Sequence, residues 1–175
     1  KMFKSMLMAT TIVAAGTVGA IAADPIMYPT TSPVVTSSTF DWDRFYLGLS
    51  VGGLNDGNQN LGVGGLAGVN MQSGDWVFGV EVQGTAYYDG GTYAGAMYDI
   101  MGRAGILVAP EALLYGAAGV VFTDTSNTYL GIGGGVEFAI HDDVTFGGEY
   151  TYITDGSGGG ADGHAFDAKV RWYFN

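Results

Sequence analysis

Two histidines, His141 and His164, are the residues of this chain best suited to acid–base chemistry, because imidazole titrates near neutral pH. A serine hydrolase would need a serine and a carboxylate within reach of such a histidine. After His164, the alternate positions hold Phe166 and Ala168, Asp167 is three residues away, and no serine stands at strand spacing. His141 precedes two aspartates, which is typical of a turn. The sequence therefore predicts no catalytic residue.

Metal and cofactor chemistry has equally little support. The chain has no cysteine, which excludes disulfides and zinc–thiolate sites. The segment 154–163 contains Gly-Gly-Gly-Ala-Asp and resembles one copy of a calcium-binding repeat, but that repeat works by stacking many copies. A flexible external loop is the favoured interpretation, with no metal site and no cofactor. Six basic residues against 17 acidic ones argue against a nucleic-acid partner.

Eight charged residues lie in segments where apolar or small residues occupy every second position. The pattern is clearest in the last segment, where Phe166, Ala168, Val170, Trp172 and Phe174 alternate with polar residues. A period of two indicates a β-strand whose two faces differ chemically. The eight charged residues are Glu81, Asp99, Arg103, Glu137, Glu149, Asp167, Lys169 and Arg171.

The same alternation recurs along the chain and predicts eight strands. They are Arg44–Gly53, Leu61–Gln72, Trp76–Thr85, Met97–Val108, Ala112–Phe122, Tyr129–Ile140, Val144–Ile153 and His164–Phe174. Tight turns are expected at 73–75, 109–111 and 141–143, and longer loops at 54–60, 86–96, 123–128 and 154–163. About ten residues per strand, tilted near 45°, span roughly 23 Å. These features predict an all-β, eight-stranded antiparallel up-and-down transmembrane β-barrel.

Alternation also assigns the two faces of each strand. The apolar residues are expected to face lipid, as in Phe45, Leu47, Leu49 and Val51 of the first strand. Aromatic residues at strand ends are expected at the membrane interfaces, where amphipathic rings prefer to lie. For the periplasmic interface these are Trp42, Trp76, Tyr115, Trp172 and Phe174, and for the outer one Tyr87, Tyr88, Tyr93, Tyr98, Phe122 and Tyr129.

The eight charged residues then point into the lumen. An eight-stranded barrel is just wide enough for side chains to fill it. Buried charges must pair, since an isolated buried ion costs several kcal/mol. Five acids against three bases predict a salt-bridged plug, in which the surplus acid reaches lumen water or is protonated. The alternative is a charged constriction in a narrow pore.

The N-terminal region is expected to lie outside the barrel. Residues 1–23 combine two lysines, an apolar stretch and the Ala-x-Ala sequence at 20–22, which predicts a cleaved signal peptide. Residues 24–43 are rich in Pro, Ser and Thr and are expected to form a periplasmic lead-in. Residues 44–175 form the barrel itself.

Several segments together resemble a known family. They are DRFYLGLSVGG at 43–53, FGVEVQ around Glu81, MGRAGILVAPEALLYGAAGVVF around Arg103, and GGGVEFAIHDDVTFGGEYTYI at 133–153. The chain is similar to the small eight-stranded outer-membrane proteins of Gram-negative bacteria, of the opacity-protein and OmpA-barrel type. The resemblance implies a porin-like membrane protein in the cell outer membrane, surrounded by lipid and lipopolysaccharide and folded by the barrel assembly machinery.

These observations favour a non-enzymatic structural barrel that stabilises the outer membrane and presents short acidic loops. A narrow porin or channel is the alternative, and a lipid-A-modifying enzyme barrel ranks behind it. A third alternative is an accessory subunit of a larger membrane or surface assembly, which would contact its partner through residues 24–43.

Overall fold

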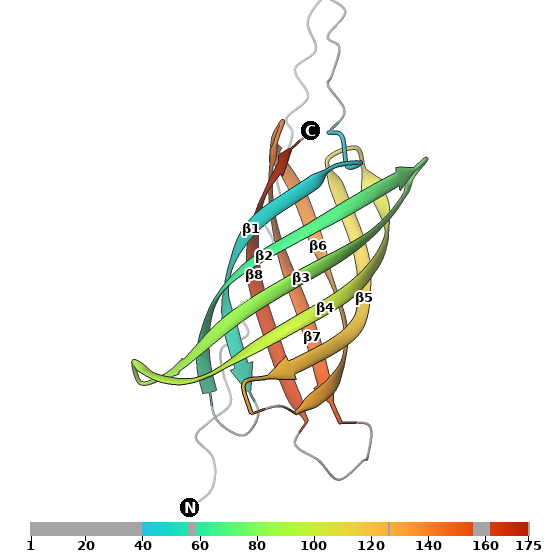
Figure 1. Cartoon of the computed structure of the whole chain (residues 1–175). Coiled ribbons are helices and arrows are strands. Elements are labelled where there is room, and N and C mark those ends of the chain that lie inside the picture. The colour runs from blue at the N-terminus through green and yellow to red at the C-terminus, as the bar shows by residue number, and fades with distance from the viewer. Residues whose placement is uncertain (1–39, 56–58, 126, 156–161, 175) are drawn as a thin grey trace, which may run out of the picture. The chain divides into compact units, whose positions relative to one another are not determined.

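Eight antiparallel strands close into a barrel in the computed structural model of the chain (Figure 1). The structure describes residues 40–55, 59–125, 127–155 and 162–174. The expected signal peptide at 1–23 and most of the lead-in at 24–43 lie outside these residues. No helix in the described ranges is long and apolar enough to cross a membrane.

Each strand pairs with its neighbours in the sequence, and β1 pairs with β8 to close the sheet. This order is the predicted up-and-down topology, so the predicted eight-stranded antiparallel barrel is confirmed. The strands are β1 Phe45–Asn55, β2 Gln59–Ser73, β3 Trp76–Asp89, β4 Thr92–Ala109, β5 Ala112–Thr123, β6 Thr128–His141, β7 Val144–Thr154 and β8 Gly163–Phe174.

The connection between β3 and β4 is the one clear departure from the expected elements. The sequence predicts a loop over 86–96, but both strands continue to a turn at Gly90 and Gly91, and the hairpin protrudes beyond its neighbours (Figure 1). These glycines have φ values of 55° and 89°, which suit a two-residue hairpin turn. The tyrosines beside the turn favour strand over loop, because aromatic residues stabilise cross-strand pairs. Tyr88 and Tyr93 pack edge to face across this hairpin.

The two ends of the barrel differ in their connections. We call the end with the two-residue connections at 74–75, 110–111 and 142–143 the turn end, and the opposite end the loop end. The carbonyls of Asp75, Glu111 and Asp143 each accept a backbone hydrogen bond from a neighbouring strand, at 2.8 Å in all three cases. The chain also enters β1 at the turn end (Figure 1). In outer-membrane barrels the end with short turns is periplasmic.

The outer surface of the barrel is apolar throughout its middle. Phe45, Leu49 and Ile132 expose 60–66% of their surface, although each lies within a regular strand. Their sequence neighbours on the other parity are buried or contribute polar groups to the interior, for example Tyr46 and Ser50. This apolar-out, polar-in arrangement reverses that of a soluble protein and suits a lipid environment.

Candidate functional site: the closed lumen

Glu81 on β3 lies at the centre of the lumen and is 2% exposed. Its Oε1 pairs with Lys169 Nζ at 2.9 Å, and its Oε2 pairs with Arg171 Nη2 at 2.8 Å. Arg103 Nη1 lies 3.4 Å from the same Oε2, and the Tyr46 hydroxyl donates to it at 2.9 Å. Glu81 therefore contacts all three lumen cations, as a buried carboxylate must if its charge is to be compensated.

Glu137 on β6 forms the second centre of the network and has no exposed surface. Its Oε2 pairs with Arg103 Nη2 at 2.6 Å and with Arg171 Nη1 at 3.2 Å. Its Oε1 accepts hydrogen bonds from the hydroxyls of Thr145 at 2.6 Å and Tyr173 at 2.7 Å. Both oxygens are thus satisfied without water.

Glu149 on β7 completes the set of paired carboxylates. Its Oε1 pairs with Lys169 Nζ at 2.7 Å, and the Tyr115 hydroxyl donates to its Oε2 at 2.8 Å. The Tyr115 ring in turn lies 4.0 Å from the guanidinium carbon of Arg103, a close cation–π contact. Gly135 leaves room for this tyrosine, since a Cβ there would lie 2.8 Å from its hydroxyl. Three carboxylates and three cations therefore form one balanced cluster, which we call the ion-pair layer.

Asp99 and Asp167 also point into the lumen, but the structure places them outside the ion-pair layer. Both are partly buried and line a small cavity on its loop-end side, together with Gln83, Thr85 and Thr151. The cavity offers about 20 Å³ to the centre of a water molecule, which is room for about one. The structure thus brings together six of the eight charged residues singled out in the sequence and leaves these two carboxylates beside the cavity.

An apolar cluster closes the lumen at the turn end. Phe40 packs edge to face on Trp42 and on Tyr173, with ring centroids 4.7 and 5.0 Å apart. Trp42 has no exposed surface, and its indole nitrogen donates to the Pro110 carbonyl at 3.2 Å. Arg44 fixes this segment by donating to Asp143 Oδ1 at 2.8 Å and to the Asp142 carbonyl at 2.9 Å.

A second apolar cluster lies at the loop end. Its buried members are Leu54, Tyr87, Val121, Ile153 and Ala165, with Met97 and Tyr129 packed against them. Five of these residues, namely Tyr87, Met97, Val121, Ile153 and Ala165, also line the cavity that holds Asp99 and Asp167. From the turn end to the loop end, the lumen therefore contains an aromatic cluster, the ion-pair layer, a small polar cavity and an apolar cap.

The expectation of an interfacial position is wrong for some of the aromatic residues. Trp42 and Tyr115 are 0% and 4% exposed and lie inside the barrel, and so do Tyr87 at 7% and the partly buried Tyr129. Strand parity explains all four, because each stands on the inward parity of its segment. Trp76, Trp172 and Phe174 do face outward and are 53%, 39% and 49% exposed.

The two histidines lie on the outside of the barrel. His164 is exposed, and its Nδ1 lies 2.8 Å from the Tyr150 hydroxyl on β7. His141 ends β6 beside the turn at 142–143 and is exposed as well. Among the residues that the structure describes, no group of three or more His, Cys, Asp or Glu side chains is placed to hold a metal ion.

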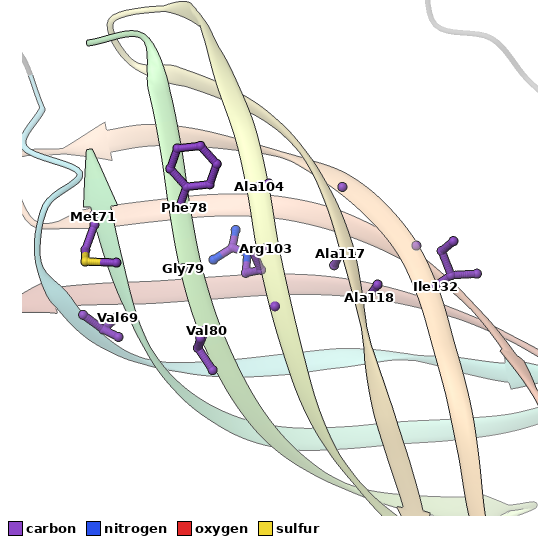
Figure 2. A pocket seen from close by; sticks show the side chains of 13 residues that line it. Val69, Met71, Phe78, Gly79, Val80, Arg103, Ala104, Ala117, Ala118 and Ile132 are labelled. Atoms are coloured by element: carbon purple, nitrogen blue, oxygen red, sulfur yellow. The ribbon is translucent and has the colours of Figure 1, made fainter. Parts of the chain in front are cut away.

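The outer face of β2–β6 contains a shallow groove formed by small residues (Figure 2). Ala104 and Ala118 form its floor, and Phe78, Val80 and Ile132 stand beside it. The lining of the groove is apolar except at Arg103, which contributes from its strand while its side chain is buried on the opposite face. This surface is suited to contact with acyl chains.

A family model for the outer membrane protein β-barrel domain matches residues 12–174. The chain belongs to this outer membrane β-barrel family. Comparison with curated proteins returns no match. Ail, the attachment invasion locus protein of Yersinia pestis, is 15% identical, with 75% of this chain and 97% of that chain covered and a TM-score of 0.53. The N-terminal barrel of Pseudomonas aeruginosa OprF is 13% identical, with 74% and 97% covered and the same TM-score. A designed transmembrane barrel is 11% identical, with 77% of this chain and 98% of the designed chain covered and a TM-score of 0.54.

Family membership sets the environment of the molecule. This outer membrane barrel resides in the cell outer membrane, so its apolar outer face meets lipid and lipopolysaccharide. At these identities the likeness to the solved structures concerns the fold, and the lumen must be interpreted from this chain's own residues.

Some lumen residues were not identified from the sequence as part of the site. The sequence pattern predicts an interfacial position for Tyr115 and Trp42, and it indicates no role for Arg44 or Thr145. Phe45 and Leu114 face outward, and side chains alternate between the two faces of a strand. Trp42, three residues before Phe45, and Tyr115, one residue after Leu114, therefore fall on the inward face. The contacts of Arg44 with the turn at 142–143 follow only from barrel closure, because the two segments are about 100 residues apart.

Proposed function

We propose that this protein is a structural barrel with a closed lumen, which stabilises the outer membrane and presents short acidic loops. The observation that carries this proposal is the ion-pair layer. Its carboxylates and cations balance in charge, and the side chains of Glu81, Glu137 and Arg103 are at most 3% exposed. A water-filled pore would leave such groups solvated.

The apolar clusters on either side of the ion-pair layer support the same function. A continuous water file would have to pass Trp42 and Tyr173 at one end and Tyr87 and Ile153 at the other, all at most 7% exposed. A barrel filled in this way keeps its interior packed and presents an apolar belt to the bilayer. Its contribution to the membrane is then mechanical and electrostatic.

The loop end carries the charge that would face the cell exterior. Asp89, Asp124, Asp155 and Asp162 are all exposed there. Carboxylate oxygens are typical ligands of divalent cations, and such cations also bind phosphates, which lipopolysaccharide carries. We infer that the loops link the protein to lipopolysaccharide through shared cations.

Cells that lack the protein provide the test. Uptake of a hydrophobic dye across the outer membrane should rise in such cells and return to normal when the wild-type gene is supplied. A variant with Asp89, Asp155 and Asp162 changed to Asn should restore normal dye uptake only partly, and one with Asp41 and Asp75 changed to Asn at the turn end should restore it fully. Equal dye uptake with and without the protein would contradict the stabilising role.

The alternatives are tested by different measurements. A narrow porin would give steady conductance in planar bilayers. An accessory subunit would co-purify with a partner in mild detergent. Residues 40–43 give little support to the accessory subunit, because Trp42 and Phe40 already pack into the barrel's own turn end. The remainder of the expected contact segment, 24–39, lies outside the described residues.

A further inference from the structure

The polar cavity between the ion-pair layer and the apolar cap has an excess of hydrogen-bond acceptors. Oxygen-bearing side chains surround it, namely Gln83, Thr85, Tyr87, Asp99, Glu149, Thr151 and Asp167. Lys169 lies near both aspartates, but its ammonium group already bonds Glu81 and Glu149. When both are ionised, Asp99 and Asp167 add two negative charges to a layer that is already balanced.

Gln83 provides an independent observation at this cavity, because one of its buried polar atoms is unpaired. The residue is 7% exposed, and its Oε1 has no hydrogen-bond partner among the residues that the structure describes. Its amide nitrogen donates to Thr85 Oγ1 at 3.0 Å, and its side chain also hydrogen-bonds Asp167. The donor side of this amide is thus engaged, and its carbonyl oxygen is left without a donor. A buried acceptor without a partner is costly, so a ligand that satisfies it is favoured.

We propose that this cavity binds one calcium ion, with Asp99 and Asp167 supplying charge and Gln83 Oε1 a neutral ligand. Calcium takes oxygen ligands from carboxylates and amide carbonyls in irregular geometry. Magnesium retains most of its water shell, and the cavity has room for one atom-sized occupant and not for a hydrated ion. A divalent ion also cancels the two surplus charges, which a single water molecule cannot do.

The site is distinct from the ion pairs that support the proposed function. The ion-pair layer closes the lumen with or without a cation beside it. Calcium would instead act on stability, because a ligand that binds only the folded state raises the unfolding midpoint with its concentration. The ion would be taken up as the barrel forms, since the apolar cap covers the cavity on the loop-end side.

The test is to refold the full chain from urea into detergent with calcium chloride, remove free ions by gel filtration and measure bound calcium by mass spectrometry. Wild type should retain about one calcium per barrel, and the double variant Asp99→Asn/Asp167→Asn should retain none. The matched control Asp89→Asn/Asp162→Asn, which removes two exposed loop-end carboxylates, should retain one. Gln83→Leu should weaken calcium binding at least tenfold.

Stability gives a second readout. Calcium should raise the urea midpoint of wild type and leave that of Asp99→Asn/Asp167→Asn unchanged. Without calcium, the double variant should be at least as stable as wild type, because it no longer carries the uncompensated charges. A wild-type barrel that retains no calcium overturns the proposal, and the cavity then holds water or protonated carboxyls. Calcium that persists in the double variant also overturns it and places the ion elsewhere.

Discussion

Replacing Arg103 with methionine should destabilise the barrel by about 3–5 kcal/mol, the cost of leaving a buried ion without its partner. The Arg103 side chain is 3% exposed and pairs with Glu137 at 2.6 Å. After the change, Glu137 retains only Arg171, at 3.2 Å, as a cation partner. Methionine preserves most of the side-chain volume, so the loss reports the charge and not a new cavity.

Two further variants separate charge from packing. Arg103→Lys retains the positive charge and one charged hydrogen bond, which contributes about 1.5–3 kcal/mol. Its free energy of unfolding should therefore exceed that of Arg103→Met by about that amount. Glu137→Gln should be harmful alone but should restore part of the stability in the Arg103→Met background. A coupling of about 0.5–3 kcal/mol between the two positions is expected for contacting residues.

Equilibrium unfolding in urea, with the barrel in lipid vesicles and tryptophan fluorescence as the signal, measures these differences. A loss below about 1 kcal/mol for Arg103→Met, with no recovery in the double variant, is the behaviour of a solvated ion pair. That result would refute the dry ion-pair layer.

Three more predictions concern the faces and ends of the barrel. Val82→Arg places a cation in lipid and should lower the free energy of unfolding in urea by about 2–4 kcal/mol. Gln83→Arg places its cation beside the surplus lumen carboxylates and should lower it less. The reverse order would mean that the strand faces are misassigned. Gly119→Ala should cost about 1–3 kcal/mol, because its Cβ would collide with the Ile100 carbonyl, while Gly102→Ala has a nearest contact at 3.6 Å and should be nearly neutral in the same assay. Trp42→Ala should cost about 3–5 kcal/mol and expose the turn end to fluorescence quenchers in detergent, and an unchanged unfolding midpoint would argue against the aromatic closure.

The strands could be predicted well from the sequence because their signal is local. Alternation of apolar and polar residues sets the faces, and the aspartate, glycine and proline residues of the tight turns mark the strand ends. The hairpin around Gly90 and Gly91 was missed because a glycine pair can be a loop or a turn, and only the flanking tyrosines favour the turn. Trp42 precedes the first strand, a position where aromatic residues are commonly interfacial. This position favoured an interfacial prediction, although alternation with Phe45 places the side chain inside.

The pairing of lumen charges is not a local property. Which carboxylate meets Arg103 depends on the positions that β3, β4 and β6 reach across the lumen once the barrel has closed. The sequence therefore identified the charged positions as a set, but not the division between six paired residues and the two aspartates beside the cavity. Hydroxyl partners such as Tyr115 and Thr145 are found only when the three-dimensional contacts are known.

Ion conductance across planar bilayers that contain the purified wild-type barrel tests the closed lumen most directly. With the ion-pair layer and both apolar clusters in place, the bilayer current should stay at the level of a protein-free membrane over hours at symmetric salt. Steady ohmic conductance, with an ion selectivity that changes in Arg103→Met, would contradict the closed lumen and establish a pore.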